Sequence, residues 1–283
     1  MVNIDTKQEF AKKLKAFAGT LADLITKDNE WTVRGFIDIF KNIYTISADT
    51  KIVSKLLEIH LFPHFCAFAE KEGYEIELAQ YQNWYPDITF ILKENPKIKF
   101  AVDLKTTYRD EEYPEFCNGF TLGSHGEYFR IRTSGKNIQH PYGEYSGHFC
   151  LGIIYSRRTV NKNEELRKYT LDEVESIPAV IKDFLFFAEE KWKIASDKSG
   201  SGNTANIGSI QNIDDICSGN GVFVNAGEAL FDDYWINFGE INTLNKNGEP
   251  KKLSSFAEYL AYRGLPSELN NPKKPKRKAK INE

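Results

Sequence analysis

The spacing of apolar residues predicts two helices in the first third of the chain. Near the N-terminus, apolar side chains recur every three or four positions, at Phe10, Leu14, Phe17, Leu21, Leu24 and Ile25. This spacing predicts a helix over residues ~7–26, whose apolar stripe is either core or a surface for a partner. A second helix is predicted around Ile52 and His60, with Asp49 or Ser47 as its N-cap and an end at Gly73.

Alternating and β-branched patterns then predict strands. The predicted strands are YEIELAQ (74–80), ITFIL (88–92), IKFAVDL (98–104) and HFCLGIIYSR (148–157). The stretch DFLFFAEEKWKIA (183–195) is compatible with a strand or a helix, and a further helix is predicted near 253–263. No repeat or clear linker divides the chain, so we expect one α/β (α+β) domain over residues 1–270 and a basic, flexible tail over 271–283.

Composition and charge narrow the class of protein. Among the 283 residues, 41% are apolar, as in a packed globular protein. The four cysteines match no zinc or redox spacing and are expected to be reduced core thiols. No run of 18 apolar residues and no signal pattern occurs, which predicts no membrane span and a cytoplasmic protein.

The charge is unevenly distributed. The tail from Lys273 to Glu283 holds six Lys or Arg residues and one Glu, a charge of +5, so the total of −3 leaves −8 on the rest of the chain. Such a body is unlike a general DNA coat. It is still compatible with a local basic cleft, or with metal ions that neutralise a carboxylate cluster.

The segment FAVDLKTT (100–107) contains the first candidate chemistry. Asp103 and Lys105 are two residues apart in a predicted strand, so they project from the same face. If ITFIL (88–92) and the strand IKFAVDL (98–104) form a hairpin that turns near Asn95, paired residues have numbers summing to about 190, which places Asp87 opposite Asp103. Facing carboxylates repel unless a cation such as Mg²⁺ joins them, and Lys105 would then stabilise developing negative charge. The alternative is an ordinary exposed ion pair on an edge strand.

Several further blocks occur in a fixed order around this segment. They are ADTKIVSKLLEI, AEKEGYEIE, QNWYPDITF, AVDLKTTY, KNIQHPYGEY and, after KWKIA, GSGNTANIGSI. Over residues ~48–265 the chain resembles the EcoRV-type type II restriction endonucleases, which belong to the PD-(D/E)xK nucleases. The resemblance implies a restriction-endonuclease-like core, with a mixed central β-sheet flanked by helices, in a U-shaped homodimer that cuts double-stranded DNA. It places the catalytic core at ~48–158 and the DNA-recognition part at ~183–265, and makes the stripe at ~7–26 a candidate dimerisation element.

The resemblance also assigns roles to single residues. Asp87 and Asp103 match metal-binding acids, Lys105 matches the catalytic lysine, and Glu58 matches a helical glutamate that acts as a further metal ligand or organises water. The implied cofactor is Mg²⁺, which Mn²⁺ can replace, with no other small-molecule cofactor. Lys51 matches a lysine close to Glu58.

The implied DNA contacts fall into three groups. Gly200, Ser201, Gly202, Asn203, Thr204, Ala205 and Asn206 match the segment that lies in the major groove and reads base edges. Asn203 offers both a donor and an acceptor to adenine, whereas Asn206 is expected to contact the DNA backbone. Gln82 and Asn83 match a shorter loop at the minor groove. Thr106, Thr107 and Lys136 are candidate contacts to phosphates.

The chain departs from the family pattern at several positions. Ala205 stands where a threonine is expected, Tyr81 replaces a glutamine, and segment 234–245 lacks the expected arginines. The recognition segment implies the target GATATC, cut to blunt ends with 5′-phosphates. The alternatives are a nuclease of the same fold with a repair or structure-specific role, and a non-cleaving DNA-binding module.

Overall fold

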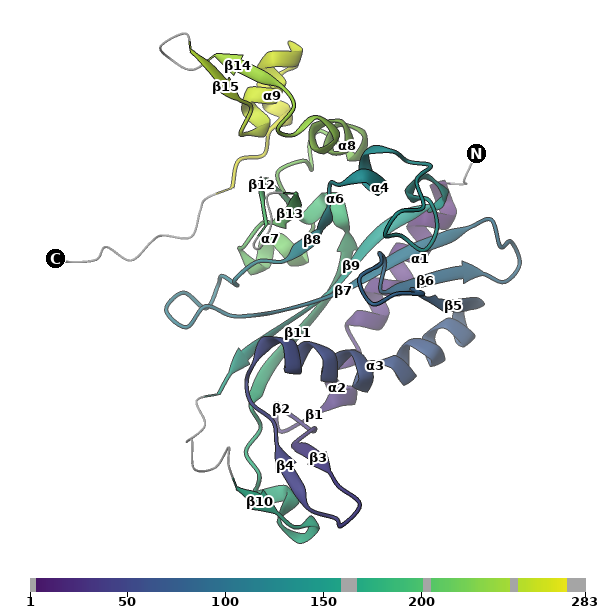
Figure 1. Ribbon diagram of the computed structural model, residues 1–283, viewed down its shortest axis with the longest axis vertical. Coiled ribbons are helices and arrows are strands. Elements are labelled where there is room, and N and C mark those ends of the chain that lie inside the picture. The colour runs from purple at the N-terminus through teal and green to yellow at the C-terminus, as the bar shows by residue number, and fades with distance from the viewer. Residues whose placement is uncertain (1–3, 159–166, 201–204, 245–248, 274–283) are drawn as a thin grey trace, which may run out of the picture.

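The centre of the molecule is a mixed sheet of seven strands. The computed structural model describes residues 4–158, 167–200, 205–244 and 249–273. The strand order is β1-β2-β11-β9-β7-β6-β5, and only β7 and β9 are parallel neighbours (Figure 1). The strands are β1 (Thr26–Lys27), β2 (Glu30–Trp31), β5 (Tyr74–Leu78), β6 (Ile88–Leu92), β7 (Lys99–Tyr108), β9 (Gly147–Arg157) and β11 (Ile181–Glu190). Helices flank this sheet, so the predicted mixed α+β fold class is confirmed.

Helices α1 (Ile4–Ala18), α2 (Leu21–Ile25) and α3 (Thr50–Glu72) build one core cluster with the sheet. The predicted single helix over ~7–26 is wrong in one respect, since the chain forms two helices separated by a turn. The Thr20 hydroxyl and backbone N–H both donate to the Phe17 carbonyl, and this local bonding ends α1. Asp49 is the N-cap of α3, as predicted, and Gly73 ends it with φ of 79°.

The apolar stripe of α1 and α2 is buried inside this chain. Phe10 is fully buried and stacks on Phe100 of β7 with ring centroids 4.1 Å apart. Leu14, Leu21 and Ile25 are also fully buried in the same cluster. Of the two interpretations of the stripe, this arrangement supports core.

We expect Phe10→Ala to lower the free energy of unfolding by about 3–5 kcal/mol, because the cavity lies among close-packed rings. Leu24→Ala is the matched control, since Leu24 belongs to the same stripe but is 50% exposed. Urea titration of both variants tests this. Equal losses would contradict the placement of Phe10 in the core.

Helix α3 is the one described helix that is long and apolar enough to cross a membrane by length and composition. Its residues Leu57, Leu61 and Phe65 are buried against the sheet. In this fold α3 is therefore a core helix, and core helices can meet the same criteria of length and composition.

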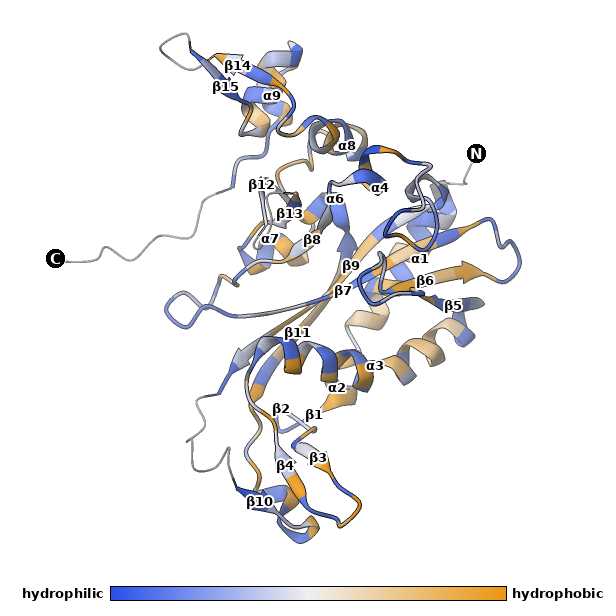
Figure 2. Ribbon diagram, viewed as in Figure 1, coloured by the Kyte–Doolittle hydropathy of each residue, from blue (hydrophilic) through white to orange (hydrophobic). Residues whose placement is uncertain are grey.

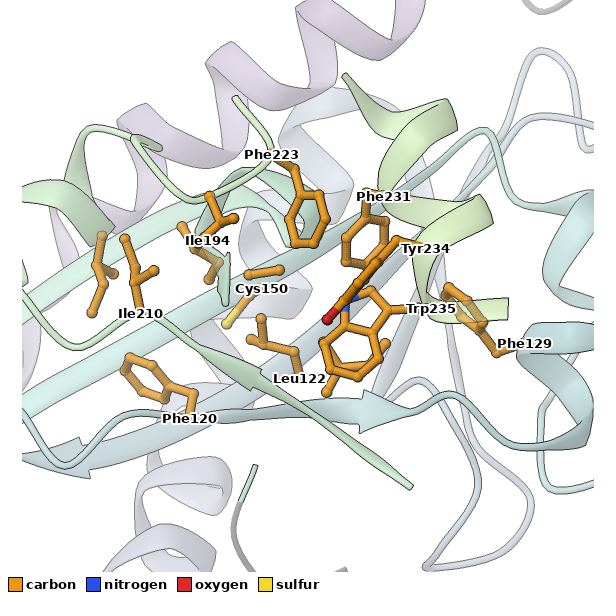
Figure 3. Packing of buried hydrophobic residues seen from close by; sticks show 14 of the residues in the cluster. Phe120, Leu122, Phe129, Cys150, Ile194, Ile210, Phe223, Phe231, Tyr234 and Trp235 are labelled. Carbon is orange, nitrogen blue, oxygen red and sulfur yellow. The ribbon is translucent and has the colours of Figure 1, made fainter. Parts of the chain in front are cut away.

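A second core cluster is formed largely by the C-terminal half of the chain. Its strands are β8 (Thr121–Ser124), β12 (Ala195–Ser199) and β13 (Asn206–Ser209), which form a small sheet, and the hairpin β14 (Asn242–Leu244) and β15 (Pro250–Lys252). The helices here are α4 (Glu127–Arg130), α6 (Lys191–Ile194), α7 (Ile213–Cys217), α8 (Glu228–Asn237) and α9 (Phe256–Arg263), with short 3₁₀ turns at Tyr142–Glu144 and Ser267–Leu269. Figure 3 shows Phe223, Phe231 and Trp235 packed around Cys150 and Leu122 of this cluster. The ambiguous stretch 183–195 is thus strand β11 followed by the single turn α6.

A separate hairpin extends from the far end of the molecule (Figure 1). It consists of β3 (Gly35–Ile37) and β4 (Ile43–Thr45), and β10 (Lys168–Tyr169) pairs with β4 as the third strand of this sheet. The 3₁₀ helix η2 (Leu171–Ser176) follows β10 in the sequence. Its tip carries exposed apolar side chains, with Ile39 90% and Phe40 78% exposed, in the hydrophobic region at the hairpin tip in Figure 2. This hairpin is the most exposed apolar part of the described chain.

Candidate active site

The hairpin of β6 and β7 has the predicted register. Ile88 pairs with Val102 and Thr89 with Ala101, so Asp87 lies at the level of Asp103 at the end of the paired region. On the N-terminal side of Ile88 a side chain continues the contact between the two strands, because Leu104 N donates to Asp87 Oδ2 at 2.7 Å. The sequence therefore places the two carboxylates together through the hairpin alone.

Lys105 completes a three-residue charge cluster. Its Nζ lies 2.7 Å from Asp103 Oδ2 and 3.7 Å from Asp87 Oδ2. The β7 strand that carries Asp103 and Lys105 lies between β6 and β9, and Asp103 is only 7% exposed. The alternative of an exposed ion pair on an edge strand is therefore wrong.

The electrostatics of the cluster favour a cation. Burial, followed by the charge of Asp103, raises the pKa of Asp87 to about 7. Burial alone would lower the pKa of Lys105, but Asp103 and Asp87 outweigh it and the pKa is raised. Two carboxyl groups held this close together are a good fit for a hard divalent cation.

Asp87 makes the stability of the metal-free protein depend on pH. Between its ordinary pKa and about 7, the folded chain keeps a proton on Asp87 that the unfolded chain has lost. We expect the free energy of unfolding to fall across this range as the pH rises, and Asp87→Asn to reduce that slope. Urea titrations with chelator at pH 5 and pH 8 test this, with the exposed Asp23→Asn as control. An unchanged slope in Asp87→Asn would contradict it.

Glu58 is only partly brought into the cluster. It lines the same pocket as Asp87 and Lys105, but its Oε1 lies 2.7 Å from Lys55 Nζ on the same helix. Within the described ranges, no group of three or more His, Cys, Asp or Glu side chains could hold a metal ion. Asp87 and Asp103 thus form the carboxylate pair, and Glu58 would join it only by releasing Lys55.

Five of the predicted DNA-contact residues line two pockets that also contain residues of the acid cluster. A pocket of 530 Å³ brings Gln82, Asn83 and Lys136 together with all three cluster residues, although Lys136 also pairs with Glu127 at 2.9 Å. A second pocket of 460 Å³ includes Glu58, Thr106 and Thr107 beside Asp87 and Lys105. Lys51 is not among these residues, since it is exposed in the first turn of α3.

Of the recognition segment, the structure describes Gly200, Ala205 and Asn206. Gly200 lines a third pocket of 610 Å³, which shares Asn118, Gly119 and Phe120 with the second. Gly200 N donates to Asn206 O, and Ala205 O accepts from His125 N, both at 2.8 Å. Ser201, Gly202, Asn203 and Thr204 lie outside the described residues.

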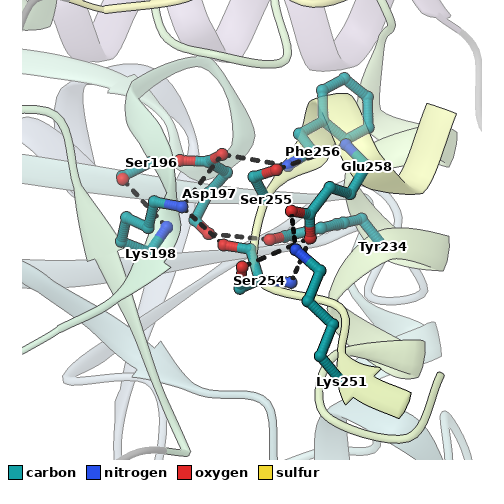
Figure 4. A network of polar contacts seen from close by, with 9 residues as sticks. All are labelled: Ser196, Asp197, Lys198, Tyr234, Lys251, Ser254, Ser255, Phe256 and Glu258. Carbon is teal, nitrogen blue, oxygen red and sulfur yellow. Dashed lines mark hydrogen bonds and ion pairs between the residues drawn. The ribbon is translucent and has the colours of Figure 1, made fainter. Parts of the chain in front are cut away.

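A polar network attaches strand β12, which leads into this segment, to the C-terminal region (Figure 4). The Asp197 carboxylate accepts from Phe256 N at 3.0 Å, and its carbonyl accepts from the Tyr234 hydroxyl at 2.7 Å. Lys198 Nζ donates to Ser254 O at 2.5 Å. Strand β12 is thus held by α8, by Ser254 and by the start of α9 as well as by the small sheet.

The sequence interpretation missed an aromatic cluster next to the acids. The Tyr85 hydroxyl is 3.0 Å from His148 Nδ1, and Tyr142 stacks on His148 with centroids 3.6 Å apart. Lys191, a buried lysine, lies among these rings. Tyr85 adjoins the PD motif, and Lys191 lies in KWKIA, but nothing in the sequence indicates that they meet.

The mixed sheet flanked by helices is consistent with the restriction-endonuclease-like fold class, and comparisons with known proteins give the family. The family model for restriction endonuclease EcoRV matches residues 27–264, so the chain belongs to the EcoRV restriction endonuclease family of DNA-hydrolysing enzymes. The chain is 36% identical to the type II restriction enzyme EcoRV of Escherichia coli over 242 residues. That match covers 85% of this chain and 95% of the relative.

Proposed function

We propose that this protein is a type II restriction endonuclease that hydrolyses phosphodiesters of double-stranded DNA at a short palindrome. The observation that carries the proposal is the Asp87–Asp103–Lys105 cluster, whose pockets are connected through shared residues to the pocket of the recognition segment. An intracellular location agrees with this function.

Asp87 and Asp103 would hold a divalent cation, with Mg²⁺ as the physiological ion. A bound Mg²⁺ would act as a Lewis acid toward the phosphate and lower the pKa of water. Lys105 would remain charged throughout, because its neighbouring carboxylates raise its pKa. It would stabilise the negative charge that grows on the scissile phosphate, in a site where Asp103 is almost excluded from solvent.

The surrounding residues would position the DNA. Gln82, Asn83 and Lys136 share the catalytic pocket, where their donors suit phosphates and the minor groove. Thr106 and Thr107 would contact the backbone from the adjoining pocket, and Lys51 would approach it from the start of α3. The segment from Gly200 to Ala205 would read base edges, and Asn206 would contact the DNA backbone.

The target proposed is GATATC, cut at its centre to blunt ends with 5′-phosphates. Its central TA step is easily deformed, so bending can add specificity where no base is contacted. Short duplexes with GATATC and with single base-pair changes test this target in Mg²⁺. Cutting of another palindrome would reject GATATC but keep the proposed activity. Nicking that follows DNA structure would instead favour a repair nuclease, and binding without cleavage would favour a DNA-binding module.

Cleavage of both strands of a palindrome calls for two subunits, and we propose a homodimer. The proposed homodimer is supported by exposed apolar residues of the β3–β4 hairpin and of η2. These residues are Phe36, Ile37, Ile39, Phe40, Tyr44, Leu171 and Val174. An exposed apolar surface of this kind is a common mark of a subunit interface.

We expect Phe40→Glu to convert a dimer to a monomer, because it places a charge in the apolar interface. Analytical ultracentrifugation measures the change. Leu244→Glu is the control, since Leu244 is 67% exposed on β14, away from the hairpin. A Phe40→Glu protein that remains dimeric would show that the interface lies elsewhere.

A further inference from the structure

Lys191 has an unusual environment for a lysine. The side chain is 3% exposed, and its Nζ has no hydrogen-bond partner among the residues that the structure describes. It lies 5.3 Å from the ring centroids of Tyr85 and of Phe129, and 5.6 Å from that of Tyr142. Aromatic faces attract the cation but do not replace the hydrogen bonds that it loses on leaving water.

The charges around Lys191 connect it to the acid cluster. Burial lowers the pKa of Lys191 to about 8, and Asp103 is the strongest charge that opposes this shift. Asp232 also attracts the ammonium, whereas Arg132 and Lys105 repel it. At neutral pH the side chain therefore remains mostly charged, with Asp103 as its main electrostatic partner.

Lys191 lies close to Gly123, a residue that lines the catalytic pocket. Gly123, which lines that pocket together with Asp103, has a φ of 88°. A Cβ at Gly123 would lie 3.4 Å from Lys191 Nζ and 3.1 Å from the Tyr128 hydroxyl. The absence of a side chain at Gly123 lets the ammonium approach the pocket wall.

The chain direction also links Lys191 to the recognition segment. Lys191 directly follows Glu190, the last residue of β11. Within β11, Glu189 pairs with Cys150 of β9, and Cys150 also pairs with Asp103 of β7. Four residues later the chain enters β12, which leads to Gly200. One short stretch thus carries both the buried cation and the strand that ends directly before Gly200.

We propose that Lys191 is a positioning residue for DNA cleavage, which acts through Asp103 and ties the orientation of that carboxylate to strand β12. This inference rests on the proposed function. Stability does not explain the lysine, because a methionine of similar length would fill the same aromatic surroundings without an unsatisfied ammonium. The protein therefore retains a charge at Lys191 at the expense of stability.

Lys191→Met tests the inference with three measurements. We expect the thermal unfolding midpoint without metal to rise by about 2–4 °C, because an unpaired buried cation is removed. DNA affinity in chelator is expected to change by less than about threefold, since Lys191 does not reach the surface. The single-turnover cleavage rate with Mg²⁺ is expected to fall roughly 10- to 100-fold, the usual effect of losing a group that orients a metal ligand.

Lys193→Met is the matched control. Lys193 lies two residues further on, with its Nζ 2.8 Å from Glu190 Oε1 and its side chain one-third exposed. We expect its cleavage rate to stay within about threefold of the parent. A coupling role also predicts that Lys191→Met lowers the ratio of cleavage at the target to cleavage at a site with one base pair changed, which a purely structural lysine would leave intact.

Two results would overturn the inference. One is an unchanged cleavage rate in Lys191→Met, and the other is a lower unfolding midpoint, which would make the lysine structural. If Lys191→Met does not fold, Lys191→Gln is measured by the same two readouts. Measuring the unfolding midpoint does not require cleavage, so it tests the inference about Lys191 even if the parent protein cuts no DNA. Absence of cleavage by the parent protein would count against the proposed function instead.

Discussion

Asp103→Ala is expected to reduce Mg²⁺-dependent DNA cleavage by at least about 1,000-fold, because it removes one of the two carboxylates available to the cation. Its affinity for DNA in chelator is expected to stay the same or to rise. Asp103 faces the pocket that would receive the phosphates, so its removal takes a negative charge away from them. Plasmid cleavage and fluorescence anisotropy measure the two effects.

The control for Asp103→Ala is Asp23→Ala, which removes an exposed acid of α2. It is expected to cleave at the parental rate. If Asp103→Ala also cleaved at that rate, the assignment of the site would be wrong. If it lost DNA binding together with cleavage, Asp103 would be holding the binding surface together, and its assignment to the cation would fail.

Lys105→Met should also abolish most cleavage, with a loss of about 100- to 1,000-fold, because it removes the positive charge that meets the developing charge on the phosphate. It leaves both carboxylates in place, so cation binding is expected to persist or to strengthen, as a repelling charge is lost. Calorimetric titration with Mn²⁺ separates this effect from cleavage. Weaker Mn²⁺ binding in Lys105→Met would contradict the division of roles.

Lys97→Met is the matched control for Lys105→Met. Lys97 lies in the turn of the same hairpin and is exposed. Parental cleavage and Mn²⁺ binding by Lys97→Met would show that the effects of Lys105→Met come from its position beside Asp87 and Asp103.

The sequence predicts the acid cluster well because its geometry is local. The β6–β7 hairpin alone determines which residues face each other, and the observed pairing of Ile88 with Val102 is the predicted one. The capping of α3 is equally local, since Asp49 accepts from the backbone N–H groups of Lys51 and Ile52. Neither feature requires knowledge of distant parts of the chain.

Other features depend on contacts that the sequence does not show. The break between α1 and α2 is invisible to apolar spacing, because Phe17 and Leu21 maintain the period across it. The environment of Lys191 is assembled from rings at Tyr85, Phe129 and Tyr142, which are distant in sequence. Burial and partners of such a group are decided by tertiary packing, so they emerge only from the structure.

The candidate site is predicted in part for a related reason. Residue types allow Glu58 and Lys136 to serve as a metal ligand and a phosphate contact, but the structure pairs them with Lys55 and Glu127. Lys55 lies one turn away from Glu58 on α3, and Glu127 is the first residue of α4. The roles of Glu58 and Lys136 remain predictions that require these pairs to open when DNA and metal bind.

Digestion of DNA of known sequence with the purified protein and Mg²⁺, followed by mapping of every end, tests the central claim most directly. The account predicts breaks at one palindrome, symmetric on the two strands, with 5′-phosphate ends, and none in chelator or with Asp103→Ala. Ends scattered without a common sequence, or cleavage that persists in chelator, would contradict it.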